Sequence, residues 1–169
     1  GADEKNVTMN ILTLSQGGLT LGQKDWYVNN DKATAAIRKA YQRHIVRMFR
    51  LYGFSEMQAE AKAKAVFRFE TMLALVSKSN TELRDPQANY NKMTLKQFEE
   101  NYPNIPLAAL TEAQGVKPEY IQDMNVCQPA FFTGLDRLSS MLTADELKAL
   151  MEWDVIMNSA SYLSSEIRE

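Results

Sequence analysis

The sequence has little of the chemistry on which small enzymes and disulfide-stabilised proteins depend. Its 169 residues include one histidine, His44, and one cysteine, Cys127. A single cysteine forms no internal disulfide, and the two residues are too few for a zinc site, which needs three or four ligands. Glycine and proline are scarce, at 7 and 5 residues, and apolar residues occur throughout, which excludes collagen-like and disordered chains. No run of about 20 apolar residues is present, so we expect no membrane segment.

An excess of basic residues is absent as well. The chain has 19 bases and 21 acids, a net charge of -2 and a pI of about 5.6. Nucleic-acid-binding domains usually carry a strong basic excess, so we expect no nucleic-acid partner. The composition, 45% hydrophobic and 24% charged, is that of an ordinary globular domain. We expect one helical domain over residues 1–169, cut at both ends from a longer polypeptide, since the start lacks methionine and a signal peptide and the end lies within a helical pattern.

Apolar residues recur at steps of three and four along several stretches, which predicts a mainly α fold. Helices are predicted over about 32–52, 56–76, 95–100, 107–114, 129–142 and 144–164. Their starts carry capping residues: Asp31, Ser55 with Gln58, Thr94 with Gln97, Pro129, and Thr143 with Glu146. The connection of Gly53 and Phe54 is short, so the first two helices form an antiparallel hairpin. The predicted architecture is a multi-helix bundle with helical hairpins.

The other stretches are predicted to be extended or irregular. Alternation over residues 7–14 predicts a short strand, residues 19–30 an ordered loop, residues 79–93 a polar connector, and residues 120–126 a second strand. The apolar stripe of the second helix is predicted on Ala65, Phe69, Met72 and Val76. The last helix has a wide apolar arc, with Leu147, Met151, Val155 and Tyr162 on one side and Leu150, Trp153 and Met157 on another, so we expect it to be buried between several neighbours.

The polar residues that might do chemistry each have a plainer interpretation. The two interpretations of His44 are a metal ligand and a packed ring, and the packed ring is favoured. The two interpretations of Cys127 are a thiolate paired with His44 and a small buried side chain, and the buried side chain is favoured. Trp26 and Tyr27 form a ligand platform or, more in keeping with their loop, a hydrophobic plug. The sequon at Asn6 is uninformative without a secretory signal.

Charged residues form two acid pairs and one basic stripe. The two carboxylates of each pair, Glu99-Glu100 and Asp145-Glu146, are adjacent in a helix and do not face each other, as acid–base catalysis would require. A solvated helix face explains the first pair better, and stabilisation by the helix dipole explains the second. The stripe repeats at steps of four, four and three: Lys39, Arg43, Arg47 and Arg50. One interpretation of the stripe is a surface that binds nucleic acid or anionic lipid. The other, which is favoured, is a helix face that is either solvated or balanced by the acids after Thr143.

Several short motifs occur in an order that is familiar. They are Gly17-Gly18-Leu19-Thr20-Leu21 with Asp25-Trp26-Tyr27, Ile37-Arg38 with Ala40-Tyr41, His44-Ile45 with Met48, Arg84-Asp85-Pro86 with Tyr90-Asn91-Lys92-Met93-Thr94-Leu95, Gln128-Pro129 with Phe131-Phe132, and Trp153 with the run from Asn158 to Ser164. In this order they resemble the N-terminal helical region of the neprilysin family of zinc metalloendopeptidases, which includes endothelin-converting enzyme and bacterial oligopeptidases. The lone Cys127 fits a bacterial member better than the disulfide-bonded vertebrate ones.

The resemblance implies a non-catalytic lobe that faces a catalytic lobe of the same polypeptide across a chamber for short peptides. The family binds zinc through a His-Glu-x-x-His helix, and this chain has no His-Glu pair, so no catalytic or metal residue is expected here and zinc belongs to the parent protein. Substrate-binding residues cannot be assigned. The residues of the motifs are expected to be structural: Gly18, Leu19, Asp25, Arg84, Asp85, Tyr90, Asn91, Gln128 and Pro129. The implied location is the bacterial periplasm or cell surface.

Two other functions compete with this one. The first alternative is an autonomous helical module that binds a partner protein. The second is a small enzyme that uses Cys127 and His44. A lobe separated from the rest of its protein should expose apolar surface and associate weakly with itself.

Overall fold

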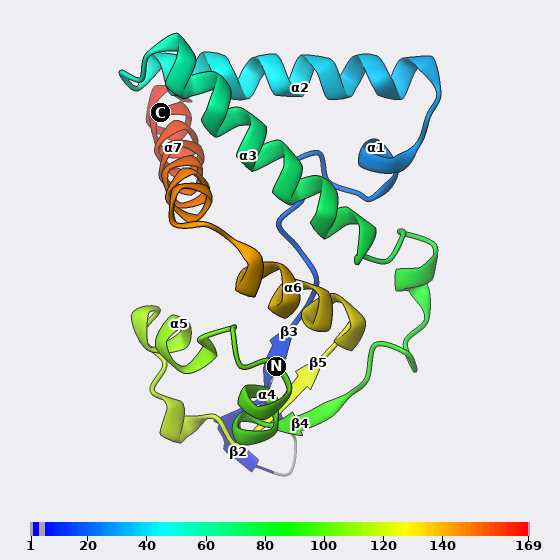
Figure 1. Ribbon diagram of the computed structural model, residues 1–169. Coiled ribbons are helices and arrows are strands. Elements are labelled where there is room, and N and C mark those ends of the chain that lie inside the picture. Colours follow the sequence, from blue (N-terminus) through cyan, green and yellow to red (C-terminus); the bar gives the residue numbers. More distant parts are fainter. Residues whose placement is uncertain (1, 4–5, 169) are drawn as a thin grey trace. The chain divides into compact units, whose positions relative to one another are not determined.

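The computed structural model describes residues 2–3 and 6–168, with side chains from Ile11 to Ser159, and it is mainly helical, as predicted (Figure 1). The α-helices are α1 (Asp25–Val28), α2 (Lys32–Leu51), α3 (Glu56–Leu75), α4 (Leu95–Asn101), α5 (Leu107–Ala113), α6 (Pro129–Met141) and α7 (Ala144–Arg168). The 3-10 helices are η1 (Glu82–Arg84) and η2 (Pro118–Tyr120). The strands are β1 (Ala2–Asp3), β2 (Asn6–Asn10), β3 (Leu12–Leu14), β4 (Lys92–Thr94) and β5 (Asp123–Val126).

The chain divides into two units whose residues contact mainly one another. The sheet unit comprises Gly1–Leu19 and Leu73–Met141, and the helix unit comprises Thr20–Met72 and Leu142–Glu169. Helix α3 passes from one unit into the other. The expectation of a single domain over residues 1–169 stays a prediction.

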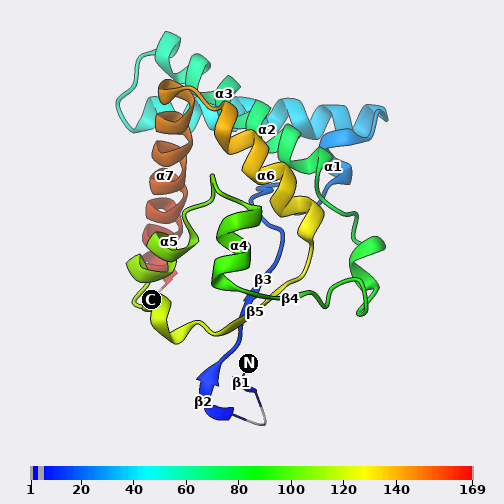
Figure 2. The same cartoon turned by 60° about the horizontal axis from the view of Figure 1, so that its bottom comes forward.

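A three-stranded sheet lies at the centre of the sheet unit, in the order β3-β5-β4. Strand β5 runs parallel to β3 and antiparallel to β4, and its inward side chains, Met124 and Val126, are fully buried. Figure 2 shows α4 rising directly from the end of β4. The strand expected over residues 7–14 is in fact two strands, because β2 pairs with β1 whereas β3 pairs with β5. Strand β4 lies in the stretch predicted to be a connector, since three residues are too few to show alternation.

The predicted helix starts agree with the structure. Asp31 accepts a hydrogen bond from the Thr34 amide, and the capping boxes that begin at Ser55, Thr94 and Thr143 are all formed. These caps satisfy amides that the first turn of a helix leaves without partners. The loop expected over residues 19–30 contains the short helix α1, and the last helix continues to Arg168, four residues beyond its predicted end.

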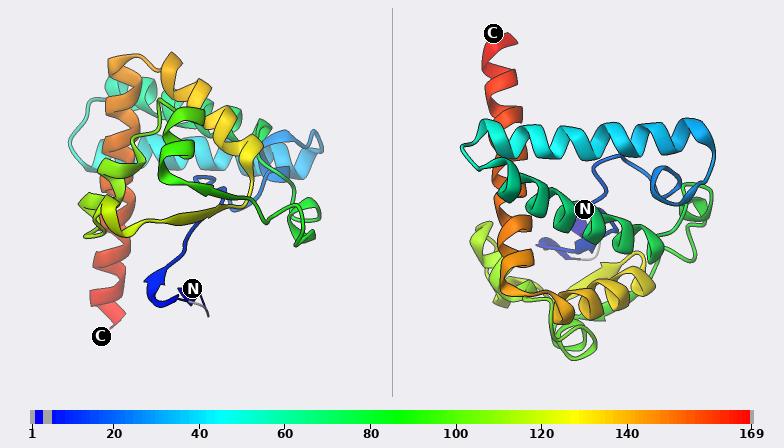
Figure 3. Two further views of the ribbon diagram at one scale, coloured as in Figure 1. Left: turned by 90° about the horizontal axis from the view of Figure 1, so that it is seen from below. Right: turned by 45° about the horizontal axis from the view of Figure 1, so that its top comes forward.

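The core of the helix unit forms where α2, α3 and α7 pack together (Figure 3, right). Gly53, with a φ of 99°, ends α2 in the left-handed region and allows the predicted α2–α3 hairpin. Ile45, Phe49 and Trp153 are buried in this core, and the centres of the Phe49 and Trp153 rings lie 5.6 Å apart. In the part of the chain that the structure describes, no helix is long and apolar enough to cross a membrane.

The buried face of α3 differs from the predicted one. Ala65, Phe69, Met72 and Val76 are only half-buried. The buried positions are Ala59, Ala63, Val66, Glu70, Leu73 and Ala74. The prediction was wrong because three of these six are alanines, which give little hydrophobic signal, and a fourth, Glu70, is a charged residue that periodicity assigns to the surface.

Candidate functional site

A buried carboxylate, that of Glu70 on α3, organises the first loop of the helix unit. Only 4% of Glu70 is exposed, and its two oxygens accept hydrogen bonds from the Tyr27 and Tyr41 hydroxyls, each at 2.5 Å. The Thr20 amide donates to Oε1 at 2.9 Å, and the Thr20 hydroxyl donates to Oε2 at 3.2 Å. A buried charge is stable only when such donors replace water. We call Glu70, Tyr27, Tyr41 and Thr20 the carboxylate cluster.

The carboxylate cluster fixes the segment that holds the first motif. The Leu21 amide donates to the Tyr27 hydroxyl at 3.1 Å, and the Arg38 guanidinium donates to the carbonyls of Trp26 and Asn29 at 3.1 and 2.6 Å. Both ends of α1 are thereby attached to α2 and α3. Tyr27 is buried while Trp26 is half-buried, so the interpretation of these aromatics as a plug agrees with the structure for Tyr27.

The tyrosine hydroxyls of this cluster should resist ionisation. Burial, reinforced by the adjacent Glu70 carboxylate, raises the pKa of Tyr27 and of Tyr41 well above the ordinary value of 10.0. Because the pKa of these hydroxyls is higher in the folded chain, the unfolded chain loses their protons at a lower pH. The free energy of unfolding that they contribute is therefore fully present below pH 10 and falls as the pH rises above 10. We expect Tyr27 and Tyr41 to give no phenolate absorbance until the chain unfolds. The variants Tyr27→Phe and Tyr41→Phe should each reduce the alkaline loss of stability, and ionisation of all seven tyrosines near pH 10 without unfolding would contradict this.

In the sheet unit, side-chain amides join three distant segments. Gln128, 4% exposed, accepts from the Gln16 amide at 2.8 Å through Oε1 and donates to Asn89 Oδ1 at 3.0 Å. Gln16 in turn donates to the Lys78 carbonyl at 2.9 Å and accepts from the Lys78 amide at 2.8 Å, as a neighbouring strand would. We call Gln16, Asn89, Asn91, Asn125 and Gln128 the amide junction.

The second half of the amide junction holds the connector against β5. The Asn91 amide donates to Asn125 Oδ1 at 2.7 Å, and the Asn91 side chain donates to the Ala88 carbonyl at 2.8 Å. The Val126 amide donates to the Asn91 carbonyl at 2.9 Å, and Asn125 also donates to the Asn89 carbonyl at 3.2 Å. Backbone groups of the connector that lie outside helices and strands thus have hydrogen-bond partners.

The motif residues lie in or beside these two networks. Gly18 has a φ of 84°, a backbone conformation that favours glycine, and a β-carbon there would lie 2.8 Å from Leu73 Cδ2. Leu19 is half-buried beside it, and Asp25 is the exposed first residue of α1. Asp85 Oδ1 accepts from the Gln87 and Ala88 amides, which forms a turn after η1.

The remaining motif residues differ in exposure. Pro129 is the first residue of α6, directly after the buried Gln128. Arg84 and Tyr90 are exposed, and 60% of Tyr90 is accessible to solvent. The structural role expected for the motif residues as a group stays a prediction.

The candidate catalytic and metal residues fall in different units of the chain. His44 is half-buried, with its ring 6.3 Å from the Trp153 ring in the helix unit. Cys127 is buried in the sheet unit and accepts a long hydrogen bond from Asn125 at 3.7 Å. In the described part of the chain, no three His, Cys, Asp or Glu side chains form a group that could hold a metal. The described residues therefore do not fit a zinc site, and no chemical step can be derived through one here.

The charged surfaces are arranged differently from one of our expectations. The basic stripe, Lys39, Arg43, Arg47 and Arg50, is exposed along α2. Two of the acids after Thr143 that were expected to balance it pair with α3 instead: Glu152 with Lys62 at 2.6 Å and Glu146 with Arg68 at 3.9 Å. Among the described residues the stripe is thus a solvated face. The Thr143 amide and hydroxyl hold the pKa of the Glu146 carboxyl below its usual range, as its capping role requires.

The sequence relatives of the chain agree with the family resemblance. A model of the N-terminal part of "Peptidase family M13" matches residues 1–169. Endothelin-converting enzyme-like 1 of Mus musculus is 27% identical over 99% of this chain and 22% of its own length. Neutral endopeptidase of Lactobacillus helveticus is 25% identical over 99% of this chain and 25% of its own.

The fold agrees as well. The open state of the zinc metalloprotease ZMP1 of Mycobacterium tuberculosis superposes with a TM-score of 0.81 at 26% identity, over 90% of this chain and 24% of that one. The chain therefore spans about a quarter of the length of the relatives that it matches. Because the family model covers all of residues 1–169, the chain belongs to peptidase family M13 and corresponds to the N-terminal region of its members.

Proposed function

We propose that this chain is a non-catalytic part of an M13 metallopeptidase, and that it helps to enclose the chamber in which short peptides are cleaved. The observation that carries the proposal is the family match over residues 1–169 in a chain that spans about a quarter of its relatives. The catalytic groups and the zinc ion are then supplied by the rest of the polypeptide, which is the principal partner of this chain. Short peptides are the substrates of the whole protein.

The described side chains support a non-catalytic role. Neither His44 nor Cys127 lies in a group of potential metal ligands, and the most heavily hydrogen-bonded carboxylate, Glu70, has its oxygens occupied by four donors within the chain. A general base needs a free lone pair that faces substrate. Glu70 is therefore suited to hold a loop and unsuited to take a proton from water.

The two networks support a steric role. A wall that excludes large substrates must keep its loops in place without help from the substrate. The carboxylate cluster does this for residues 20–29 and the amide junction for residues 79–93, both by buried or partly buried hydrogen bonds. We propose that the motif residues, among them Gly18, Asp85 and Gln128, set these loop geometries and do not contact substrate.

Complementation of the separated parts tests the proposal. The remainder of the polypeptide is expressed with and without this chain, and cleavage of a short fluorogenic peptide is compared with cleavage of a long unfolded protein. This chain alone should cleave neither substrate, and its addition should raise the preference of the remainder for the short peptide. An unchanged preference would refute the chamber role, and cleavage by this chain alone that is lost in Cys127→Ala would favour the small-enzyme alternative.

The alternative of an autonomous interaction module draws on one observation, the exposure of the apolar residues Leu147, Met151 and Val155 on α7. A reading frame that ends near Glu169 would favour the module. A reading frame that continues into a His-Glu-x-x-His segment would favour the metallopeptidase.

A further inference from the structure

The exposed side of α2 carries charge of one sign only. Of the ten exposed residues of this helix, five are basic, five are apolar, and none is acidic or neutral polar. The bases are the basic stripe and one residue before it: Lys32, Lys39, Arg43, Arg47 and Arg50. The apolar residues are Ala33, Ala36, Ile37, Ala40 and Leu51. We call these ten residues the α2 outer face.

The other two long helices of the helix unit differ from α2 in this respect. The exposed residues of α3 include Glu56 and Glu60 as well as Lys64, and those of α7 include Asp154 as well as Lys148. Solvated surfaces of globular proteins usually mix both signs in this way. Helix α2 has six bases and no acid, although the net charge of the whole chain is -2. Positive charge is therefore concentrated on one helix of a chain that is acidic overall.

The charge of the α2 outer face is not neutralised within the chain. In the part that the structure describes, the side chains of its five bases form no ion pair or hydrogen bond, and the ion pairs of the helix unit join α3 to α7. The sixth base, Arg38, is half-buried and holds the carbonyls of Trp26 and Asn29. Like charges four residues apart, as at Lys39 and Arg43, repel one another and destabilise a helix. An anionic partner outside the chain would relieve this repulsion.

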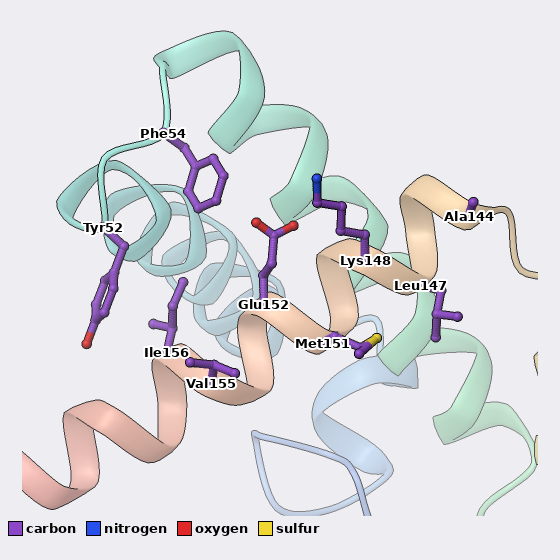
Figure 4. Close-up of a pocket in the computed structure, with 9 residues that line it drawn as sticks. All are labelled: Tyr52, Phe54, Ala144, Leu147, Lys148, Met151, Glu152, Val155 and Ile156. Atoms are coloured by element: carbon purple, nitrogen blue, oxygen red, sulfur yellow. The ribbon is translucent and has the colours of Figure 1, made fainter. Parts of the chain in front are cut away.

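The shape of the α2 outer face suits a flat partner. Helix α2 is straight (Figure 1), and its five exposed bases lie within an arc of about 80° over a length of about 27 Å. The apolar groove of the helix unit, about 490 Å³ in volume, is lined by α7 and the α2–α3 connection and by no residue of α2 (Figure 4). The bases thus stand on a convex helix surface outside this groove, where a planar array of negative charges can contact all of them together.

The exposed apolar residues distinguish a lipid surface from other polyanions. The exposed fractions of Leu51 and Ile37 are 72% and 37%, and both residues lie on the same edge of the α2 outer face, about 80° and 120° around the helix from Arg43. The phosphates of a nucleic acid offer these side chains nothing to bury against. The boundary between lipid headgroups and acyl chains accepts apolar side chains beside bases, which is the composition of helices that lie on membranes.

We propose that the α2 outer face binds to the surface of an anionic lipid bilayer. Its bases contact the lipid phosphates, and Leu51 and Ile37 enter the boundary between headgroups and acyl chains. Each base near such a surface strengthens binding about fivefold, so five bases should give half-maximal binding at about 0.1 to 1 mM lipid. The contact is peripheral and reversible, and raising the salt concentration to about 0.5 M should weaken it more than tenfold.

Co-sedimentation of the chain with vesicles tests the proposal. We expect binding to vesicles of equal parts phosphatidylglycerol and phosphatidylcholine and none to phosphatidylcholine alone. Arg43→Gln with Arg47→Gln should raise the lipid concentration for half-maximal binding about 25-fold, whereas Arg43→Lys with Arg47→Lys should leave it within about twofold, because a lipid surface responds to charge and not to guanidinium geometry. The matched control is Lys92→Gln with Lys96→Gln, two exposed bases of the sheet unit, which changes the net charge equally and should have no effect.

The apolar part of the contact is tested separately. Leu51→Ser should weaken binding to the anionic vesicles about threefold at low and at high salt, since the loss is one of apolar burial. The same variant should not change the weak binding of the chain to a DNA duplex. Because Leu51 is mostly exposed, the variant should fold as the wild type does, and its free energy of unfolding serves as the check.

A fluorescent label reports the orientation on the vesicle. In a Cys127→Ser background, a polarity-sensitive label on Ala36→Cys, in the middle of the α2 outer face, should shift its emission to shorter wavelength when anionic vesicles are added. The same label on Ala61→Cys, an exposed position on α3, should not shift.

Four results would overturn the proposal. They are the absence of binding to anionic vesicles, equal weakening by the Lys92 and Lys96 control, an unchanged affinity of Leu51→Ser, and equal shifts of both labels. A DNA duplex that binds more tightly than vesicles at the same phosphate concentration would assign the α2 outer face to nucleic acid. Binding that is present in this chain but lost in the complete polypeptide would assign it to an acidic surface of the remainder.

Discussion

Replacing Glu70 by leucine is expected to lower the free energy of unfolding by about 4 kcal/mol. Leucine has a similar size but accepts no hydrogen bonds, so the buried hydroxyls of Tyr27 and Tyr41 and the Thr20 amide would all lose their acceptor. Each donor left unsatisfied in the interior costs about 1–3 kcal/mol, and the loss should exceed that of an ordinary surface carboxylate several-fold. Chemical denaturation of the wild type and the variant measures the difference.

A double-mutant cycle separates the lost hydrogen bonds from the change in packing. In the background Tyr27→Phe with Tyr41→Phe the two main donors are absent, so Glu70→Leu should cost less than half of its effect in the wild type. The same cost in both backgrounds would show that the hydrogen bonds do not explain the effect. Glu56→Leu, on the exposed first turn of α3, is a matched control and should change stability by no more than about 0.5 kcal/mol.

Gly134→Ala is the second substitution for which we expect a large effect, and its sign opposes the usual rule. Alanine within a helix normally stabilises by about 1 kcal/mol relative to glycine. Here a β-carbon on Gly134 would lie 2.6 Å from Val76 Cβ and Cγ1, closer than carbon atoms can approach. Val76 directly follows α3, and its branched side chain has no flexible tip that could move aside, so α6 must shift. We expect a loss of about 2 kcal/mol in the free energy of unfolding.

Two further variants test this steric explanation. Gly17→Ala is a suitable control in the same unit, because no atom lies within 4 Å of the position that the alanine methyl would take and the φ of Gly17 is not positive. Its stability should change by no more than about 0.5 kcal/mol. Combining Gly134→Ala with Val76→Ala removes the two γ-carbons but keeps the β-carbon, and part of the loss should be recovered. Stabilisation by Gly134→Ala alone would show that α6 and the end of α3 are less closely packed than these distances indicate.

The features that were predicted correctly from the sequence are local ones. A capping box places its partners three residues apart, so Ser55, Thr94 and Thr143 mark helix starts without any knowledge of the fold. The same holds for Gly53, whose role is to end one helix. The mainly helical class and the hairpin of α2 and α3 follow from such signals, and the order of the motifs indicated the family.

The features that were missed depend on residues far apart in the chain. Glu70 bonds to residues 43 and 29 positions away, and the Gln16–Gln128 contact spans 112 positions. Periodicity carries no information on such pairs. One signal was available: Glu70 follows Val66 by four residues and Ala63 by seven, and a carboxylate on that face of α3 has to find buried donors. The exposure of large apolar residues on α7 was missed for the converse reason, because an apolar face shows that a partner is needed but not whether this chain contains it.

The amide junction has one property that sets it apart from the carboxylate cluster. All of its side chains are amides, which neither gain nor lose a proton in the pH range where proteins fold. Its hydrogen bonds therefore keep the same donors and acceptors in alkaline surroundings, whereas the carboxylate cluster relies on two phenolic protons. The two units should accordingly respond differently to pH: alkali should loosen the first loop of the helix unit while the connector of the sheet unit keeps its conformation.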